Sequence, residues 1–232
     1  MVNNWINIIQ EYCLPPTCLF CNEPSHNPRD LCSFCEKALP RNKDCCIHCG
    51  HPMTPANNPS SCGQCLTNPP YFDSTLAPFR YQRTVRYAIQ SFKYHDNYNF
   101  ARLLGELLAS EIVTENPLPQ RLIPVPLHAS RYRERGFNQA FEIAKIISQH
   151  HKIPVDNCSL QRRRPTDHQS HLKAKSRSQN IKNAFLLSQK ITVSHVAIID
   201  DVMTTGNTVN ELARMLKTAG VQNVDVWVCA RA

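Results

Sequence analysis

The sequence predicts an α/β protein in which a domain with a parallel sheet follows a small cysteine-rich module. Ten of the twelve cysteines precede Leu66, and eight of these ten form Cys-x-x-Cys pairs. Close to the C-terminus, a strand pattern, a helix pattern and a second strand pattern follow one another, which is typical of a parallel strand pair. Pro69 and Pro70 indicate a turn or linker. We therefore expect the module over residues 1–70 and the α/β domain over residues 71–232.

Hydrophobic periodicity predicts the elements of the α/β domain one by one. Apolar residues three and four positions apart indicate helices, and short continuous apolar runs indicate buried strands. We expect, in order, a strand over 74–81, helices over 85–92 and 100–112, a strand running into a loop over 122–127, a helix over 137–148, a strand over 196–199, a helix over 207–218 and a strand over 224–228. Residues 162–182 have no clear period, and we expect a long mobile excursion there.

The paired cysteines of the module predict two zinc ions. Two residues between thiolates let one turn of chain place both sulfurs on one ion, and a tetrahedral four-thiolate site needs two such pairs. Sequential pairing is the simplest arrangement, and a crossed pairing stays open. Because four thiolates leave no open coordination position, we expect the zinc ions to be structural. The predicted ligands are Cys18, Cys21, Cys32, Cys35, Cys46, Cys49, Cys62 and Cys65.

The N-terminus and the overall hydropathy favour a cytoplasmic protein. The first nine residues lack a basic start and a small-residue cleavage site, so we expect no secretory signal. No stretch reaches the roughly 18 apolar residues that a membrane span needs. In a reducing compartment, paired cysteines are better explained by metal than by disulfides.

The net charge of +8 is unevenly distributed along the chain. Residues 162–182 hold seven basic residues and one acid, and so carry six of the eight net positive charges. Such a field favours a phosphorylated partner, either a small molecule or a nucleic acid. A solvated basic loop without a partner is the alternative.

A second motif runs from Val196 to Thr208. A buried strand delivers two carboxylates, Asp200 and Asp201, and a turn rich in hydroxyls follows at the start of a helix. Unpaired backbone N–H groups and the helix dipole favour an anion at such a turn. The two carboxylates would repel that anion at contact, so we expect them to face the vicinal hydroxyls of a sugar and a magnesium ion.

This run resembles the phosphoribosyl-pyrophosphate (PRPP) binding motif of type I phosphoribosyltransferases. Four apolar residues, two acids and two variable residues precede Thr-Thr-Gly-x-Thr. The resemblance implies a phosphoribosyltransferase-like domain that binds PRPP with magnesium. It implies that Asp200 and Asp201 hold the ribose hydroxyls. The residues implied to hold the 5′-phosphate are Thr204, Thr205, Gly206, Asn207 and Thr208.

The chain as a whole resembles the ComF/GntX family. The resemblance is carried by the block over 122–139, the Phe92-Lys93-Tyr94 step, the four Cys-x-x-Cys pairs, and Thr166, Gln169, Leu172, Arg177, Asn180, Ala184 and Phe185. Members of this family join a double zinc ribbon to a phosphoribosyltransferase-like domain. The resemblance implies a role in natural competence, with incoming single-stranded DNA and the competence machinery at the inner membrane as partners.

The resemblance also implies binding roles for further residues, from their positions in the family pattern. The loop after the strand over 122–126 would bind pyrophosphate through Leu127, His128 and Arg131, and the basic segment takes the place of the mobile catalytic loop of the transferases. Tyr132 and Phe137 are candidates for stacking on bases, although Phe137 also fits a helix core. The residues predicted to contact nucleic acid are Arg133, Arg135, Arg162, Arg163, Arg164, Lys173, Lys175 and Arg177.

Three functions remain open from the sequence. The first is a competence protein that binds PRPP and handles single-stranded DNA. The second is an active phosphoribosyltransferase of nucleotide salvage, although no group of residues indicates a base pocket. The third is a PRPP-sensing regulator whose affinity for nucleic acid depends on the ligand.

Overall fold

The computed structural model describes residues 16–25, 27, 29–54, 60–94, 97–115, 117–164 and 184–232. Its centre is one parallel sheet in which the strands lie in the order β1-β7-β6-β3, and β2 pairs with β7 beyond the end of β1. The strands of this sheet are β1 (Ser74–Leu76), β2 (Phe79–Arg80), β3 (Arg121–Pro124), β6 (His195–Met203) and β7 (Asn223–Arg231). The predicted parallel α/β fold is confirmed.

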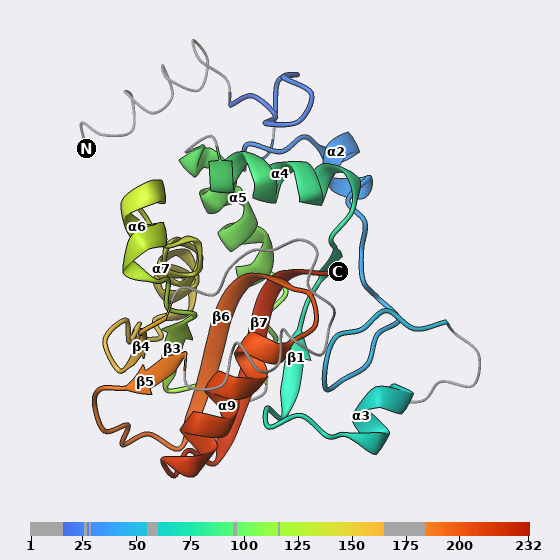
Figure 1. The fold of residues 1–232 in the computed structure, drawn as a ribbon. Coiled ribbons are helices and arrows are strands. Elements are labelled where there is room, and N and C mark those ends of the chain that lie inside the picture. Colours follow the sequence, from blue (N-terminus) through green and yellow to red (C-terminus); the bar gives the residue numbers. More distant parts are fainter. Residues whose placement is uncertain are drawn as a thin grey trace.

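Helices cover both faces of the sheet (Figure 1). Side chains of β6 alternate between two apolar clusters: Ala197 and Ile199 pack with α4, α5 and α7, whereas Val196 and Ile198 pack with α9. Because both faces are buried, the central strands are continuous apolar runs rather than alternating ones. The helices are α4 (Arg83–Tyr94), α5 (Tyr98–Ala109), α6 (Ala129–Arg135), α7 (Gln139–His151) and α9 (Asn207–Thr218).

Most predicted elements are found at or close to their expected positions. The differences are that α6 lies where a loop was expected, that β7 continues beyond residue 228 to Arg231, and three others. The strand expected over 74–81 is divided into β1 and β2 at Ala77 and Pro78. The strand expected over 196–199 continues to Met203, because residues 200, 202 and 203 still pair with β7. Arg162 ends a strand rather than beginning a loop: β4 (Leu160–Arg162) pairs antiparallel with β5 (Phe185–Leu187). Most of the expected excursion, residues 165–183, lies outside the described residues.

The cysteine-rich segment packs directly on the α/β domain. It contains two short helices, α2 (Ser33–Lys37) and α3 (Gly63–Thr67). The Phe20 ring lies 5.6 Å from the Phe100 ring on α5. Arg41 forms an isolated antiparallel bridge with Phe79 of β2, and the Arg80 N–H donates to the Pro40 carbonyl at 2.8 Å, so this part of the segment lies beside the sheet.

The described residues contain no helix that combines the length and the apolar character required to cross a membrane.

Candidate functional site

The carboxyl ends of β3 and β6 meet at one edge of the sheet. Pro124 lies in register with Ile199, and the Val125 N–H donates to the Ile199 carbonyl at 2.9 Å. The segments that follow these two strands therefore emerge side by side, which is where open α/β sheets bind ligands. A pocket of about 410 Å³ lies at this edge and is lined by residues from both segments.

An acid pair lies in this pocket, held by the backbone of its own strand. Asp200 accepts a hydrogen bond from the Asp201 N–H at 2.9 Å, and Asp201 accepts one from the Val202 N–H at 2.8 Å. Asp201 is buried, with 4% of its surface exposed. Lys93 from α4 reaches this carboxylate, and its Nζ lies 2.6 Å from Asp201 Oδ2. The deeper of the two acids is thus neutralised by a lysine from a distant part of the chain.

The surroundings of the acid pair shift the pKa of Asp200 and the pKa of Lys93. Burial, together with the negative charge of Asp201, raises the pKa of Asp200 to about 7. Burial opposes the charge on Lys93, but the ion pair with Asp201 outweighs it and raises the pKa of the lysine. Lys93 therefore stays charged beside Asp201, and Asp200 titrates near neutral pH. The site therefore presents little net negative charge and can accept a ligand that carries phosphate groups beside hydroxyls.

The turn after β6 has the shape of an anion cradle. Gly206 has a φ of +76°, a left-handed conformation that favours glycine. It is the N-cap of α9, and no side chain among the described residues caps this end of the helix. The first N–H groups of α9 and the neighbouring threonine hydroxyls are therefore available to an anion. Thr204 and Thr208 line the pocket, and Thr204 and Thr205 are exposed.

Basic residues also line this pocket. The N-cap of α6 is His128, whose Nδ1 accepts from the Ser130 N–H at 3.2 Å. Arg131 and Arg135, also on α6, line the pocket. Arg162 enters from β4, with its guanidinium 5.5 Å from the centre of the Phe185 ring. Three arginines from two elements thus line the same pocket as the acid pair.

The residues predicted to bind the ligand or nucleic acid divide into four groups. Those that line the pocket are Leu127, His128, Arg131, Asp200, Asp201, Thr204 and Thr208, together with Arg135 and Arg162 from the predicted nucleic-acid set. Thr205, Gly206 and Asn207 belong to the same turn at the start of α9. Arg133, Arg163 and Arg164 are exposed. Lys173, Lys175 and Arg177 lie outside the described residues.

Sequence reasoning gave no role to Lys93 or Gln139, and both line the pocket. A signal for Lys93 exists in the sequence: it is a lysine directly after Phe92 at the end of an apolar helix period. No comparable signal marks Gln139, because only the three-dimensional arrangement brings the start of α7 to the pocket. Phe137, one of two stacking candidates, is a core residue, with its ring stacked 5.0 Å from the Phe92 ring.

The cysteines form two groups of four. In each group the sulfur atoms lie within 4.8 Å of one another, and the grouping is sequential: Cys18, Cys21, Cys32 and Cys35 in the first, and Cys46, Cys49, Cys62 and Cys65 in the second. The sulfurs of Cys21 and Cys32 are 3.7 Å apart, and those of Cys49 and Cys62 are 3.6 Å apart. Zinc–sulfur bonds of about 2.3 Å in a tetrahedron place the sulfurs about 3.8 Å apart. Both groups fit a zinc ion.

Backbone donors favour the thiolate form of one cysteine in each group, whereas burial is the largest cause that raises the pKa of Cys35 and Cys65. Burial opposes ionisation of Cys18 and Cys46, but hydrogen bonds from neighbouring backbone N–H groups lower the pKa of each thiol to about 6. Cys62 N, for example, donates to Cys46 Sγ at 3.3 Å. Thiolates are the form that binds metal. Cys45, next in the chain to Cys46, is not a member of either group.

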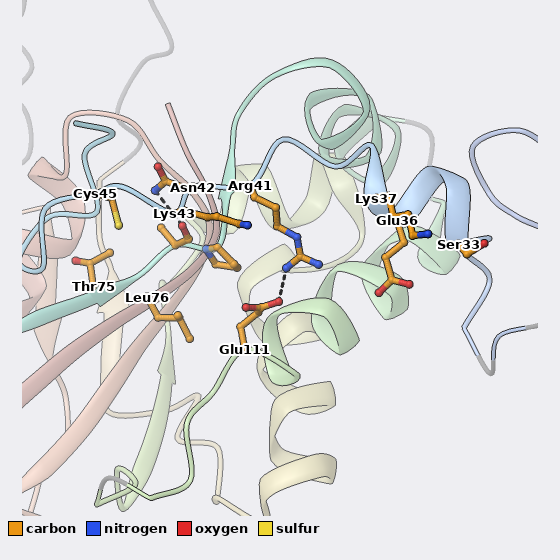
Figure 2. Close-up of a pocket in the computed structure, with 12 residues that line it drawn as sticks. Ser33, Glu36, Lys37, Arg41, Asn42, Lys43, Cys45, Thr75, Leu76 and Glu111 are labelled. Atoms are coloured by element: carbon orange, nitrogen blue, oxygen red, sulfur yellow. Dashed lines mark hydrogen bonds and ion pairs between the residues drawn. The ribbon is translucent and has the colours of Figure 1, made fainter. Parts of the chain in front are cut away.

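A larger pocket, of about 670 Å³, lies between the cysteine-rich segment and the edge of the sheet. Figure 2 shows that Arg41 reaches Glu111, at the end of α5, across this pocket. Lys37, Lys43 and Glu36 also line it, so its charges of opposite sign largely balance. It contains neither the acid pair nor the threonine turn, and we place the candidate site at the smaller pocket.

Comparison with known proteins finds two family models that match this chain. Residues 9–66 match the double zinc ribbon domain, and residues 138–232 match the phosphoribosyl transferase domain. The DNA utilization protein YhgH of Salmonella typhi is 34% identical over 227 residues, covering 94% of this chain and 98% of that protein. Competence protein F of Haemophilus influenzae is 34% identical over 224 residues, covering 93% and 96%. Competence protein ComFC of Streptococcus pneumoniae is 23% identical over 159 residues, covering 68% of each chain. The chain therefore belongs to the ComF/GntX family of competence proteins.

Proposed function

We propose that the chain binds PRPP with magnesium in the smaller pocket and acts in natural transformation, where it handles incoming single-stranded DNA. One observation carries the ligand assignment: a pair of acids, threonines of an anion-binding turn and three arginines line one pocket. PRPP carries the matching groups, namely vicinal hydroxyls, a 5′-phosphate and a pyrophosphate. The volume of about 410 Å³ is within the usual range for small-molecule sites.

Each part of the pocket has a role in this proposal. Asp200 and Asp201 accept hydrogen bonds from the ribose hydroxyls, and the turn over 204–208 binds the 5′-phosphate. Arg131, with the loop after β3, binds the pyrophosphate. Carboxylate and phosphate oxygens are the ligands that magnesium prefers, so Asp200 would hold the ion together with the ligand. The ion would neutralise part of the pyrophosphate charge.

The role in competence rests on the names of the relatives and on the distribution of charge. Competence protein F of Haemophilus influenzae aligns with nearly the whole chain. Arg133, Arg163 and Arg164 are exposed and can neutralise a phosphate backbone without sequence preference. Tyr132, beside Arg133 on α6, is 52% exposed and is available to stack on a base.

A second function, nucleic-acid binding that depends on PRPP, is favoured by the neighbourhood of Arg162. This residue lines the ligand pocket, whereas the next two residues, Arg163 and Arg164, are exposed. A ligand that contacts Arg162 would therefore act on the segment that we assign to DNA.

We also propose that two structural zinc ions stabilise the cysteine-rich module over residues 1–70, and that the domain over 71–232 carries the ligand site.

Replacing both acids by asparagine tests the ribose assignment. Asp200→Asn/Asp201→Asn keeps the size of both side chains, and the amide oxygen introduced at position 201 can still accept a hydrogen bond from Lys93. Because the charged acceptors are removed, PRPP binding should weaken at least about tenfold, measured by calorimetry with magnesium. The control is Asp225→Asn, because Asp225 pairs with His195 near the N-terminal ends of β6 and β7, away from the acid pair. Equal PRPP affinity in the double variant and the wild type would rule out the ribose assignment.

Elemental analysis tests the zinc assignment with a control from the adjacent residue. The wild type should hold about two zinc ions per chain, because each group of four thiolates completes one tetrahedral site. Cys46→Ser removes one ligand and should lower the content to about one ion. Cys45→Ser should leave the content unchanged, since Cys45 belongs to neither group. Equal loss of zinc in the two variants would contradict the ligand assignment.

Salt dependence tests the interaction with DNA. The affinity for single-stranded DNA should fall with salt, and Arg163→Ala/Arg164→Ala should reduce the slope of log K against log salt by about 0.7 for each phosphate that is no longer neutralised. Arg86→Ala/Lys190→Ala is the control, because it removes two exposed positive charges elsewhere. Fluorescence anisotropy with a labelled oligonucleotide measures both. If the two double variants lower the slope equally, general charge rather than this segment binds DNA.

A further inference from the structure

The ligand pocket contains a buried amide with an unused donor. Gln139, the first residue of α7, lines the pocket, and only 4% of its surface is exposed. Its Nε2 is buried and has no hydrogen-bond partner among the described residues. A buried donor without a partner destabilises the folded protein, and such groups in native proteins require an explanation.

Arg135 determines which end of the amide is unused. The Arg135 guanidinium donates to Gln139 Oε1 at 3.2 Å. A guanidinium has donors only and cannot accept a hydrogen bond. The atom that faces Arg135 must therefore be the amide oxygen, which assigns the unused end of the amide as the NH₂ group. Any ligand atom that pairs with this group must be an acceptor.

The neighbouring residue shows that the start of α7 is firmly held. Asn138 donates to the Val125 carbonyl at 3.1 Å and accepts from the Ala140 N–H at 3.0 Å. These two bonds fix the first turn of α7 to the loop after β3. Gln139 is thus attached to an anchored helix start, so the lack of a partner for its Nε2 among the described residues does not come from a loose chain end.

The charge around Gln139 selects the kind of acceptor. Arg135 contacts Gln139, Arg131 lines the same pocket, and the N-terminal end of α7 adds the partial positive charge of the helix dipole. An anionic oxygen fits this field better than a neutral carbonyl. We infer that Gln139 is a binding residue for the pyrophosphate group of the ligand, and that its Nε2 donates to a phosphoryl oxygen. The inference rests on the proposed binding of PRPP and adds a residue from α7 to it.

Two substitutions at Gln139 distinguish the loss of its hydrogen-bond donor from a change in the size of its side chain. Gln139→Met has nearly the same size and removes both polar atoms. Gln139→Glu keeps an acceptor for Arg135 and replaces the donor by a negative charge. Gln222→Met is the control, because Gln222 is exposed and forms its hydrogen bonds to Ser194 and Lys217 through its backbone. Thermal unfolding of each variant checks that the protein is folded before binding is measured.

Calorimetry with three ligands in the presence of magnesium tests the inference: PRPP, inorganic pyrophosphate, and ribose 5-phosphate, which lacks the pyrophosphate. Gln139→Met should weaken the binding of PRPP and of pyrophosphate about tenfold, and Gln139→Glu should weaken both further. The affinity for ribose 5-phosphate should change by less than about twofold in Gln139→Met. Gln222→Met should bind all three ligands as the wild type does.

The outcomes separate this inference from the proposed function. If Gln139→Met binds PRPP and pyrophosphate as the wild type does, the role of Gln139 is wrong and PRPP binding stands. A uniform loss of affinity for all three ligands would also refute the role, because it would show a general effect on the pocket. If the wild type binds pyrophosphate through Gln139 but does not bind PRPP, the role stands and the proposed function is wrong. No binding of any ligand by the wild type would overturn both.

Discussion

The ion pair between Lys93 and Asp201 is the interaction on which the rest of the site depends. Two neighbouring carboxylates at a partly buried position cannot both stay charged without a nearby cation. Lys93 supplies that cation from α4, with its Nζ 2.6 Å from Asp201. Removing one partner of a buried pair costs about 3–5 kcal/mol, because the other charge is left uncompensated. The pair therefore joins α4, whose Phe92 is fully buried in the core, to the carboxyl end of β6.

The charges of the pocket follow from this pair. With Asp201 neutralised and the pKa of Asp200 raised to about 7 by burial and by its neighbour, the centre of the pocket is close to neutral. The threonine turn at the start of α9 and the arginines of α6 and β4 contribute to the same pocket and favour anionic groups. A ligand that carries both hydroxyls and phosphate groups is complementary to these residues. The cysteine-rich segment contacts α5 through Phe20 and Phe100, and α5 packs against α4, the helix that supplies the lysine.

The sequence was sufficient for the features that depend on neighbours in the chain. The cysteine spacing, the apolar run that leads into Asp200 and Asp201, and the turn before α9 are local patterns. The parallel order of β6 and β7 follows from the helix between them. Contacts between distant segments could not be predicted. Lys93 is 108 positions before its partner, and Gln139 reaches the pocket only because Asn138 fixes the start of α7 to the loop after β3. Arg162 was assigned to nucleic acid from its place in a basic run, whereas its position on β4 brings it to the ligand pocket.

The most direct test of the account is a crystal structure of the protein with PRPP and magnesium. We expect the ribose hydroxyls within hydrogen-bond distance of Asp200 and Asp201, the 5′-phosphate at the turn over 204–208, and the pyrophosphate toward α6 and the start of α7. A structure in which the threonine turn is closed to the ligand at saturating concentration, or in which the ligand lies elsewhere, would contradict the account. The likeness to phosphoribosyltransferases would then be one of fold and not of function.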